Sequence, residues 1–227
     1  MDSRSIVVTG GFGALGRAVS KAFADQGHTV SRVDFAPSAP DENHSGKDYP
    51  GIDLADAAAC DTIVADICAG AGGIDVLVNI AGGFAWETLE DGSLDTWQRM
   101  FTMNVVTAAT ISKAALASLR SSDSGRIISI GAGGAIHAGA GLGAYAASKS
   151  GVHRFTEALA AELAGTTVTA NAILPSIIDT PTNRSDMPDA DTSNWVKPEA
   201  IAEVILFLAS PAARSISGAL IPVSRGG

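Results

Sequence analysis

A tyrosine and a lysine stand four positions apart in the segment Tyr145-Ala-Ala-Ser-Lys149. Apolar periodicity predicts a helix over Ala144–Leu163, and on a helix this spacing places both side chains on one face. An ammonium close to a phenol favours the tyrosinate form, so Lys149 would lower the pKa of Tyr145. The pair therefore indicates general acid–base chemistry near neutral pH. A tyrosine and a lysine at this spacing also arise by chance in many helices.

A glycine-rich turn follows the first predicted strand, Ser5–Thr9, and opens a helix predicted over Leu15–Gln26. Glycines let the backbone turn tightly and approach a pyrophosphate, while the helix start directs N–H groups and its positive dipole end at the anion. The turn predicts a dinucleotide site, whose contacts we expect from Gly10, Gly11, Phe12, Gly13, Ala14, Leu15 and Gly16.

An aspartate, Asp34, ends the second predicted strand at the distance from the turn at which a carboxylate can accept hydrogen bonds from the adenosine ribose. The same carboxylate would repel a 2′-phosphate. NAD(H) is therefore the expected cofactor and NADP is disfavoured, although Arg17 and Arg32 lie close enough in sequence to bear on the choice.

The elements that must position these residues alternate between strand and helix along the whole chain. The apolar runs predict strands at Ser5–Thr9, Thr29–Asp34, Val76–Ile80, Gly125–Ile130, Val168–Ile173 and Ala219–Val223, and helices at Leu15–Gln26, Ala55–Ala69, Asp95–Arg120, Ala144–Leu163 and Pro198–Ala209. Such alternation requires parallel strands. The expected fold is α/β: a single, doubly wound Rossmann-type domain over residues 1–227, with a mainly parallel sheet of about seven strands.

Two long segments lack periodicity. Ala36–Tyr49 is polar and contains prolines, as a surface loop does. Residues 177–196 follow a strand at the carboxyl edge of the sheet, where we expect a substrate loop; a merely disordered loop is the alternative.

Composition narrows the classes of partner. A net charge of -9 without a basic stripe argues against nucleic acid, so a small molecule is the expected partner. Cys60 and Cys68 have no spaced partners that would form a metal site, and we interpret both as reduced packing residues. Because the first strand begins at Ser5 and no apolar run approaches membrane-spanning length, we expect no signal peptide, no membrane contact and a cytoplasmic location.

The order of these motifs resembles the short-chain dehydrogenase/reductase family over essentially the whole chain. The resemblance implies that Asp53 and Leu54 hold the adenine, and that Lys149 binds the nicotinamide ribose and tunes Tyr145. Asn104 would hold a water in a proton relay, and Thr180 would meet the nicotinamide amide. The last strand would pack at an oligomer interface, which implies a homodimer or homotetramer. Further cofactor contacts are expected at Asn79, Ala81, Gly82, Pro175 and Ile178.

The sequence departs from the family pattern at two places. Ala14 occupies the usual middle glycine of the turn, and Ala132 stands where the family usually has a catalytic serine. Alanine cannot donate a hydrogen bond to a substrate carbonyl. Three explanations stay open: the substrate is already electrophilic, another donor such as His137 or Ser129 replaces the serine, or carbonyl reduction is not the reaction.

Both departures resemble the dihydropteridine reductase branch of the family, whose members reduce a quinonoid dihydropterin with NADH. The long loop is also similar to that branch, at Leu174-Pro175, Asp179-Thr180-Pro181, Asn183-Arg184, Met187-Pro188, Ala190-Asp191 and Trp195. The middle of the chain, around Phe84–Glu87 and Asn104, is more similar to ordinary bacterial dehydrogenases.

Aromatic residues close to these motifs are candidate substrate contacts. Phe84 and Trp86 are expected either to wall a flat substrate or to pack in the core. Met187 and Trp195 are expected to close over the substrate from the long loop. Ala132 and His137 complete the expected substrate set.

The leading interpretation is an NAD(H)-dependent short-chain oxidoreductase that transfers a hydride between nicotinamide and a carbonyl or a quinonoid or imine-like small molecule, with Tyr145 as general acid or base. One alternative is a dihydropteridine reductase proper. Another is a catalytically weak NAD-binding regulatory protein, because Ala132 replaces the serine; the presence of Tyr145, Lys149 and Asn104 together argues against it. A purely structural protein would leave the glycine turn and Asp34 unexplained.

Overall fold

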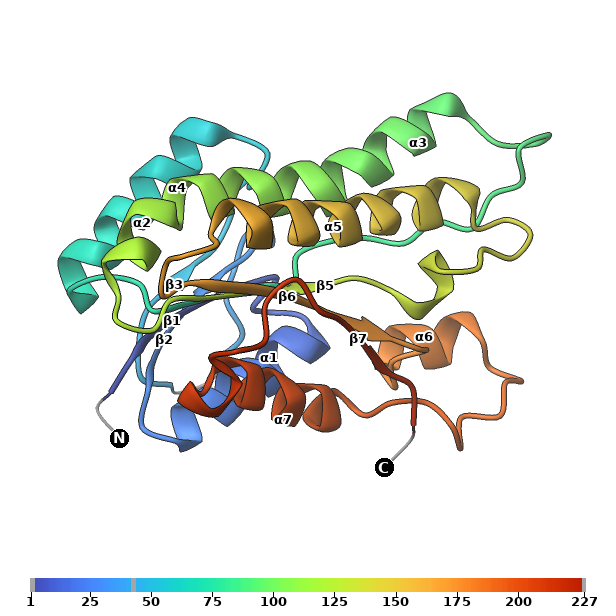
Figure 1. Ribbon diagram of the computed structural model, residues 1–227. Helices are drawn as coiled ribbons and strands as arrows, with labels where there is room; N and C mark the ends of the chain where they lie inside the picture. Colours follow the sequence, from blue (N-terminus) through green and yellow to red (C-terminus); the bar gives the residue numbers. More distant parts are fainter. Residues whose placement is uncertain (1–2, 42–43, 226–227) are drawn as a thin grey trace.

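Parallel strands form one sheet at the centre of the molecule (Figure 1). The computed structural model describes residues 3–41 and 44–225, so the chain ends and two positions of the predicted 36–49 loop lie outside it. Within that part of the chain the sheet has seven strands, in the order β3-β2-β1-β4-β5-β6-β7. Their bounds are β1 Ser5–Thr9, β2 Thr29–Val33, β3 Asp48–Tyr49, β4 Val76–Asn79, β5 Arg126–Ile130, β6 Thr169–Pro175 and β7 Leu220–Val223.

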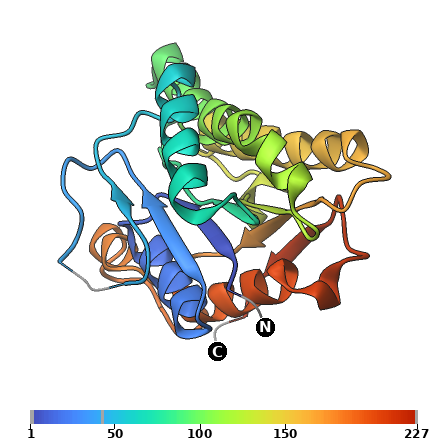
Figure 2. The ribbon, with the colours of Figure 1, turned by 90° about the vertical axis from the view of Figure 1, so that its left-hand side faces the viewer.

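Helices cover both faces of the sheet, so the fold has three layers (Figures 1 and 2). The helices α1 (Ala14–Asp25) and α7 (Pro198–Ala209) pack together on one face. The opposite face carries α2 (Ala57–Ala71), α4 (Thr107–Ser121) and α5 (Gly143–Glu162). Shorter pieces are α3 (Leu94–Phe101), the π-helical turn η1 (Thr102–Val106), α6 (Pro181–Asp186) and the 3-10 turns η2 (Gly133–Ala135) and η3 (Pro211–Ala213).

The central strands are buried on both faces because successive side chains point to opposite sides of the sheet. In β1, Ile6 and Val8 join the core under α1 and α7, whereas Val7 joins the core under α2 and α4. Each fully buried aliphatic side chain of this kind stabilises the fold by roughly 1.5–3 kcal/mol. The apolar runs in the sequence therefore mark the strands that hold the two helical layers together.

The predicted fold class is confirmed, and the predicted elements match the observed ones apart from a few residues at their ends. Two elements were missed: β3, inside the expected 36–49 loop, and α6, inside the 177–196 segment. The helix predicted over Asp95–Arg120 is divided by η1 into α3 and α4.

The continuous helical segment 94–121 corrects one expectation. It has the length and mean hydropathy of a membrane-crossing helix, whereas the sequence indicated no run of that length. In the fold this segment packs against α2, α5 and the strands β4 and β5, so it forms part of a helical layer.

Candidate active site

The candidate site lies at the carboxyl ends of β1 and β4, where the strand order reverses. Crevices of doubly wound sheets open at this switch point. Thr9, the last residue of β1, joins the two strand ends: its Oγ1 accepts hydrogen bonds from the N–H groups of Ile80 (3.1 Å) and Ala81 (3.2 Å). The glycine turn after β1 and the segment after β4 are thereby held side by side.

The glycine turn has no room for a side chain at Gly10, Gly11 or Gly16. A Cβ on Gly10, whose φ is +64°, would lie 2.9 Å from the nitrogen of Ala81. A Cβ on Gly16 would lie 2.1 Å from the carbonyl oxygen of Gly10. The N-cap of α1 is Gly13, so no side chain caps the first N–H groups of the helix. This turn fits a pyrophosphate, the ligand that the sequence predicts for it.

Asp34 is held rigidly beside the turn. Its Oδ2 accepts from the N–H of Phe12 (2.9 Å) and its Oδ1 from the N–H of Ala36 (3.0 Å). Each carboxylate oxygen keeps capacity for a second hydrogen bond, which a ribose hydroxyl can supply. The position agrees with the expected ribose contact.

Of the two residues expected to hold the adenine, Asp53 is exposed and Leu54 is buried. The N–H of Ile52 donates to the carbonyl of Asp34 (2.9 Å), which brings the 52–54 segment next to this strand end. Asp53 is exposed there and accepts from the N–H of Ala55 (2.8 Å). The side chain of Leu54 is only 4% exposed and belongs to the core, so any contact with adenine falls to its backbone.

Asn79 points into the interior. Its Nδ2 donates to the hydroxyls of Ser112 (3.0 Å) and Ser129 (3.5 Å), and its Oδ1 has no protein partner. The same contact places Ser129 on the α4 side of the sheet, fully buried, so Ser129 does not replace the missing serine. Of the residues that follow Asn79, Ala81 lies beside Gly10 of the glycine turn and Gly82 lies beside Asn104 and Lys149.

Asn104 lies in η1 and ties three elements together. Its Nδ2 donates to the carbonyl of Gly83 (3.1 Å) and to Ser148 Oγ (2.9 Å), and its Oδ1 accepts from the N–H of Gly83 (3.1 Å). The side-chain amide is thus engaged with the protein, and it fixes the loop after β4 against α5. A relay water, as the resemblance implies, would have to use the backbone here.

The acid–base pair lies on α5 beside the same loop. A Cβ on Gly82 would lie 3.4 Å from Lys149 Nζ, so the segment after β4 and the lysine are in contact. Lys149 is buried and donates to the carbonyl of Ile130 (2.8 Å). Burial lowers its pKa to about 8. The ring of Tyr145 stands edge-on to Phe84, with centroids 4.9 Å apart.

The direction expected for the Tyr145 pKa is wrong in this structure. Burial raises the pKa of Tyr145 to about 12, because desolvation penalises the phenolate. Tyr145 is therefore a protonated phenol across the neutral range and is ready to donate a proton.

A buried histidine that the sequence did not single out supports the strand end at Ala132. His153 Nε2 accepts from the N–H of Ala132 (3.3 Å), one helical turn beyond Lys149. A Cβ on Gly131 would lie 2.5 Å from that nitrogen, so a glycine is needed for the approach. Lys149 and His153 thus hold the end of β5 from one face of α5. The i, i+4 spacing after Lys149 was the available signal.

Phe84 and Trp86 line the rim of the site. Their side chains are 60% and 63% exposed, which excludes the core-packing alternative. Trp86 Nε1 donates to the carbonyl of Ala140 (3.1 Å), and the N–H of Glu87 donates to that of Gly141 (2.8 Å). The segment after β4 is therefore joined to the loop after η2, on which His137 lies exposed.

The 177–196 segment is closed at its base. The backbone of Val196 bonds to Ile177 and Asp179 (both 2.8 Å), and Ile178 pairs with Val196. Thr180 caps α6 by accepting from the N–H of Asn183 (3.1 Å). Pro175 is buried at the end of β6, and Met187 is half-buried after α6.

Trp195 corrects an expectation. It was predicted to close over a substrate, but its side chain is only 6% exposed, at the base of the segment. An indole packed inside the loop's base cannot also cover a ligand, so Met187 is the one of the two that stays available.

No group of three or more metal-ligating side chains comes together among the described residues. Cys60 is buried, and burial raises the pKa of its thiol to about 11. Cys68 is half-buried, and both thiols are free.

Comparison with known proteins agrees with this geometry. Residues 4–191 match the family model described as short chain dehydrogenase. The chain is 30% identical to a 3-oxoacyl-acyl-carrier-protein reductase of Vibrio harveyi, covering 100% of this chain and 98% of the relative. It is 31% identical to a galactitol 2-dehydrogenase of Rhizobium johnstonii, covering 100% and 95%. The ligand-free structure of the Thermoplasma acidophilum aldohexose dehydrogenase superimposes with a TM-score of 0.89 at 26% identity, covering 97% and 92%.

Proposed function

Because this chain belongs to the short-chain dehydrogenase family and is therefore an oxidoreductase, we propose that it transfers a hydride between NAD(H) and a small molecule, with Tyr145 handling the proton. The observation that carries the proposal is the contact of Gly82 with Asn104 and Lys149. This contact places the glycine turn, which suits a dinucleotide, and the acid–base pair on either side of the segment after β4.

In the reductive direction, bound NADH supplies the hydride to the substrate carbon. Tyr145 donates its phenolic proton to the substrate atom that gains the electron pair. Lys149, with its pKa near 8, is charged in a substantial fraction of molecules at neutral pH and steadies the phenolate that results. When the nicotinamide ribose is bound, Lys149 would exchange its bond to the Ile130 carbonyl for one to the ribose.

The preference for NAD(H) rests on Asp34. Its carboxylate is fixed by two backbone N–H groups and would face an adenosine ribose, where it stabilises hydroxyls and repels a phosphate. We expect Asp34→Asn to weaken NADH binding about tenfold, since a hydrogen bond to a charged group contributes about 1.5–3 kcal/mol, and to strengthen NADPH binding.

Fluorescence titration of both cofactors checks this expectation. Asp25→Asn is the control, because Asp25 is an exposed aspartate paired with Lys21. Equal loss of NADH and NADPH affinity in Asp34→Asn would contradict the role given to the carboxylate.

For the substrate we propose a conjugated, electrophilic small molecule. Ala132 offers no side-chain donor, Ser129 faces away, and the exposed ring of Phe84 contacts Tyr145, with the exposed ring of Trp86 two residues further along the chain. A carbon that is already electron-poor needs little polarisation before it accepts a hydride. The quinonoid dihydropterin implied by the branch resemblance is one compound of this class and stays an alternative.

The test follows NADH absorbance with quinonoid dihydropterin and a panel of ketones, for the wild type, Tyr145→Phe and Ala132→Ser. We expect turnover of conjugated substrates by the wild type and a loss of about 10²- to 10⁴-fold in Tyr145→Phe. Ala132→Ser should gain activity on simple ketones. NADH binding without any turnover, even in Ala132→Ser, would favour the regulatory protein.

We also propose a homodimer or homotetramer. The edge strand β7 pairs only with β6 among the described strands, and its apolar residues Leu220, Ile221 and Val223 are half-buried. Edge strands of this kind are favourable places for association. A monomeric mass by light scattering would contradict the proposal.

A further inference from the structure

The residues that join β5 to α5, 131–142, border the candidate site, and we call them the β5–α5 segment. Ala132 and His137, two of the expected substrate contacts, belong to it. Its far end is fixed to the rim, because Trp86 Nε1 donates to the carbonyl of Ala140 (3.1 Å). The bonds that hold its near end therefore decide where these contacts lie relative to the acid–base pair.

The near end lies just beyond the last backbone hydrogen bond between β5 and β6. The N–H of Gly131 donates to the carbonyl of Ile173 (2.8 Å), whereas the next N–H, that of Ala132, donates to a side chain of α5. The acceptor is Nε2 of His153, at 3.3 Å. Because buried backbone N–H groups are almost always paired, this imidazole completes the end of the strand.

The chain leaves room for this contact at one position and reinforces it at another. His153 is only 3% exposed. A Cβ on Gly131 would lie 2.5 Å from its Nε2 and 2.7 Å from its Cδ2, so a glycine is needed for the ring to approach. On the preceding turn of α5, Ser150 Oγ donates to the carbonyl of Ala135 (3.0 Å). Two turns of α5 thus hold the near end of the β5–α5 segment.

Only the neutral imidazole can make the bond to Ala132. Since Nε2 is the acceptor, the ring proton lies on Nδ1, and a second proton on Nε2 would set two N–H groups against each other. Burial lowers the pKa of His153, as do the charges of Arg154 and Lys149, whereas Glu157 raises it. Among the described residues, the elements packed against α5, which are α3, η1, η2, β5 and β6, add no further charge that acts on this ring. His153 is therefore neutral at pH 7.

We propose that His153 is a positioning residue for the substrate. Its neutral ring fixes Ala132 and hence the β5–α5 segment, and protonation in mild acid releases this segment and weakens substrate binding. The inference rests on the proposed hydride transfer, but the contact itself can be measured without turnover. NADH affinity should not respond, because β1 and β2, which lead to the glycine turn and Asp34, lie on the other side of β4 from β5.

The kinetic test measures kcat and KM for a conjugated substrate at saturating NADH, from about pH 5 to about pH 8. In the wild type, KM should rise as the pH falls below the ordinary histidine pKa of 6.5. His153→Leu should raise KM about tenfold at every pH, as for one buried N–H left unpaired, with kcat less affected. His153→Gln keeps an acceptor that does not titrate, so it should restore the wild-type KM at neutral pH and show no rise in acid.

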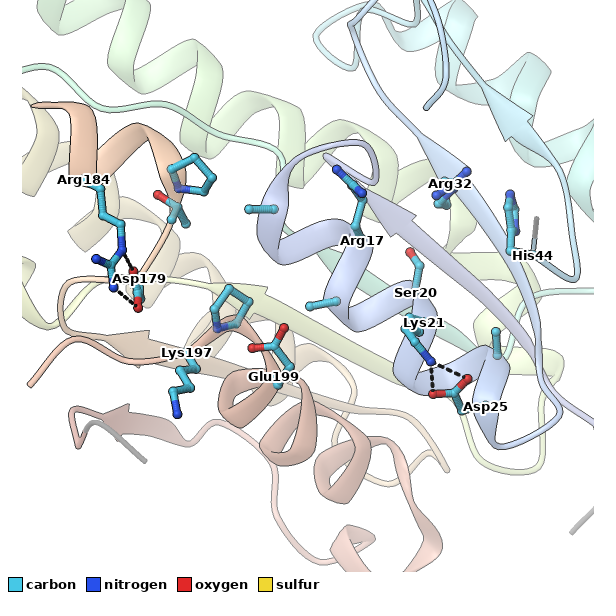
Figure 3. Close-up of a pocket in the computed structure, with 16 residues that line it drawn as sticks. Arg17, Ser20, Lys21, Asp25, Arg32, His44, Asp179, Arg184, Lys197 and Glu199 are labelled. Carbon is cyan, nitrogen blue, oxygen red and sulfur yellow. Dashed lines mark hydrogen bonds and ion pairs between the residues drawn. The ribbon is translucent and has the colours of Figure 1, made fainter. Parts of the chain in front are cut away.

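The chain has four histidines, so the titration must be assigned among them. His28 is the matched control, because it is buried and its Nδ1 also accepts a backbone N–H, that of Arg4 (3.2 Å), at the opposite edge of the sheet. His44 lies at one end of a groove of about 930 Å³ along the outer side of α1, on the other face of the sheet from α5 (Figure 3). His28→Asn and His44→Gln should keep the rise of KM in acid.

His137, the remaining histidine, offers a competing assignment, because it is exposed on the β5–α5 segment itself. If the rise of KM in acid disappeared in His137→Gln and persisted in His153→Gln, the proposal would be overturned.

Gly131→Ala tests the same contact from the side of the strand. Its Cβ should displace the imidazole and raise KM about as much as His153→Leu does. In the double variant Gly131→Ala/His153→Ala the space is vacated, so the added methyl should change KM little relative to His153→Ala alone. Additive effects of the two changes would contradict the close approach of the ring.

Hydrogen exchange at the Ala132 amide, followed by NMR at neutral pH, measures the contact without a substrate. Exchange should be slow in the wild type and in His153→Gln, and faster in His153→Leu. Equal exchange in all three proteins, or faster exchange in His153→Leu with an unchanged KM, would overturn the proposal. The expected exchange in a protein that turns over no substrate would leave the contact standing and remove the proposed function, and the positioning role with it.

Discussion

Burial shifts the pKa values of the two residues of the acid–base pair in opposite directions. Tyr145 stays protonated because desolvation raises its pKa to about 12, and Lys149 loses its proton easily because desolvation lowers its pKa to about 8. Neither shift is visible in a spacing of four residues. Both shifts come from burial of the two side chains, which only the fold produces.

At this residue scale, kcat/KM for NADH should fall as the pH rises through about 8, because Lys149 loses the charge that binds the nicotinamide ribose. In Lys149→Arg the guanidinium stays charged, so the alkaline fall near pH 8 should disappear even though the maximum rate is lower. An unchanged fall near pH 8 in Lys149→Arg would assign the titration to another group.

Sequence reasoning identified most of the candidate residues but not how each is used. Asp34 lies next to the glycine turn, whereas the contact expected between Thr180 and a nicotinamide stays a prediction. His153 was missed because its spacing of four residues after Lys149 gains a meaning only when its partner, the N–H of Ala132, is known. Trp195 was misplaced because burial at a loop base depends on the backbone pairing of Ile178 with Val196, which the sequence does not reveal.

At the scale of elements, the glycine turn is a close fit between the start of α1 and the end of β4. Gly16→Ala should destabilise the protein by at least about 2 kcal/mol and abolish NADH binding, because its Cβ would lie 2.1 Å from a backbone oxygen that cannot move aside. Urea unfolding and NADH titration measure the two effects.

Gly70→Ala is the matched control, since Gly70 lies in α2 and a Cβ there meets nothing within 4 Å. This variant should gain about 0.5–1 kcal/mol from helix propensity and bind NADH normally. If Gly16→Ala and Gly70→Ala lost comparable stability and NADH affinity, the turn would not be the close fit described.

The elements that the sequence missed are those without a pattern of their own. A strand of two residues, β3, shows no alternation, and it exists because Arg32 and Val33 of β2 offer a free edge. The helix α6 begins at Thr180-Pro181, a capping residue followed by proline, which was a readable start signal. The turn η1 interrupts an unbroken apolar period and has no sequence signature of this kind.

For the whole molecule, the buried Lys149 links stability to pH. The pKa of Lys149 in the folded state is about 8, below the ordinary lysine value of 10.5. Between pH 8 and pH 10.5 the folded state therefore binds fewer protons than the unfolded state. Because of this difference, the contribution of Lys149 to the free energy of unfolding rises with pH over that range. The difference between these two pKa values corresponds to about 3 kcal/mol in the free energy of unfolding.

The free energy of unfolding of the wild type minus that of Lys149→Met should therefore increase by about 3 kcal/mol from below pH 8 to above pH 10.5. The subtraction cancels the titration of the other lysines and tyrosines. The lost bond to the Ile130 carbonyl adds only a constant offset. A difference that does not vary with pH would show that the lysine is not desolvated.

The architecture as a whole was the most predictable level. Strand runs buried on both faces, alternating with helices, admit few arrangements, and the right-handed crossover reduces their number further. The comparisons show to which family the chain belongs. The reductase and the two sugar or polyol dehydrogenases named above, however, act on different compounds. Fold and family therefore leave the substrate to be found by experiment.

The most direct test of the central claim is to follow the hydride itself. The enzyme is incubated with NADH that carries deuterium at the transferred position of C4 and with a conjugated electrophile, and the product is weighed by mass spectrometry. Our account predicts a product heavier by one deuterium with the wild type, and almost none with Tyr145→Phe although that variant still binds NADH. Oxidation of NADH without deuterium in the product, or full labelling by Tyr145→Phe, would contradict it.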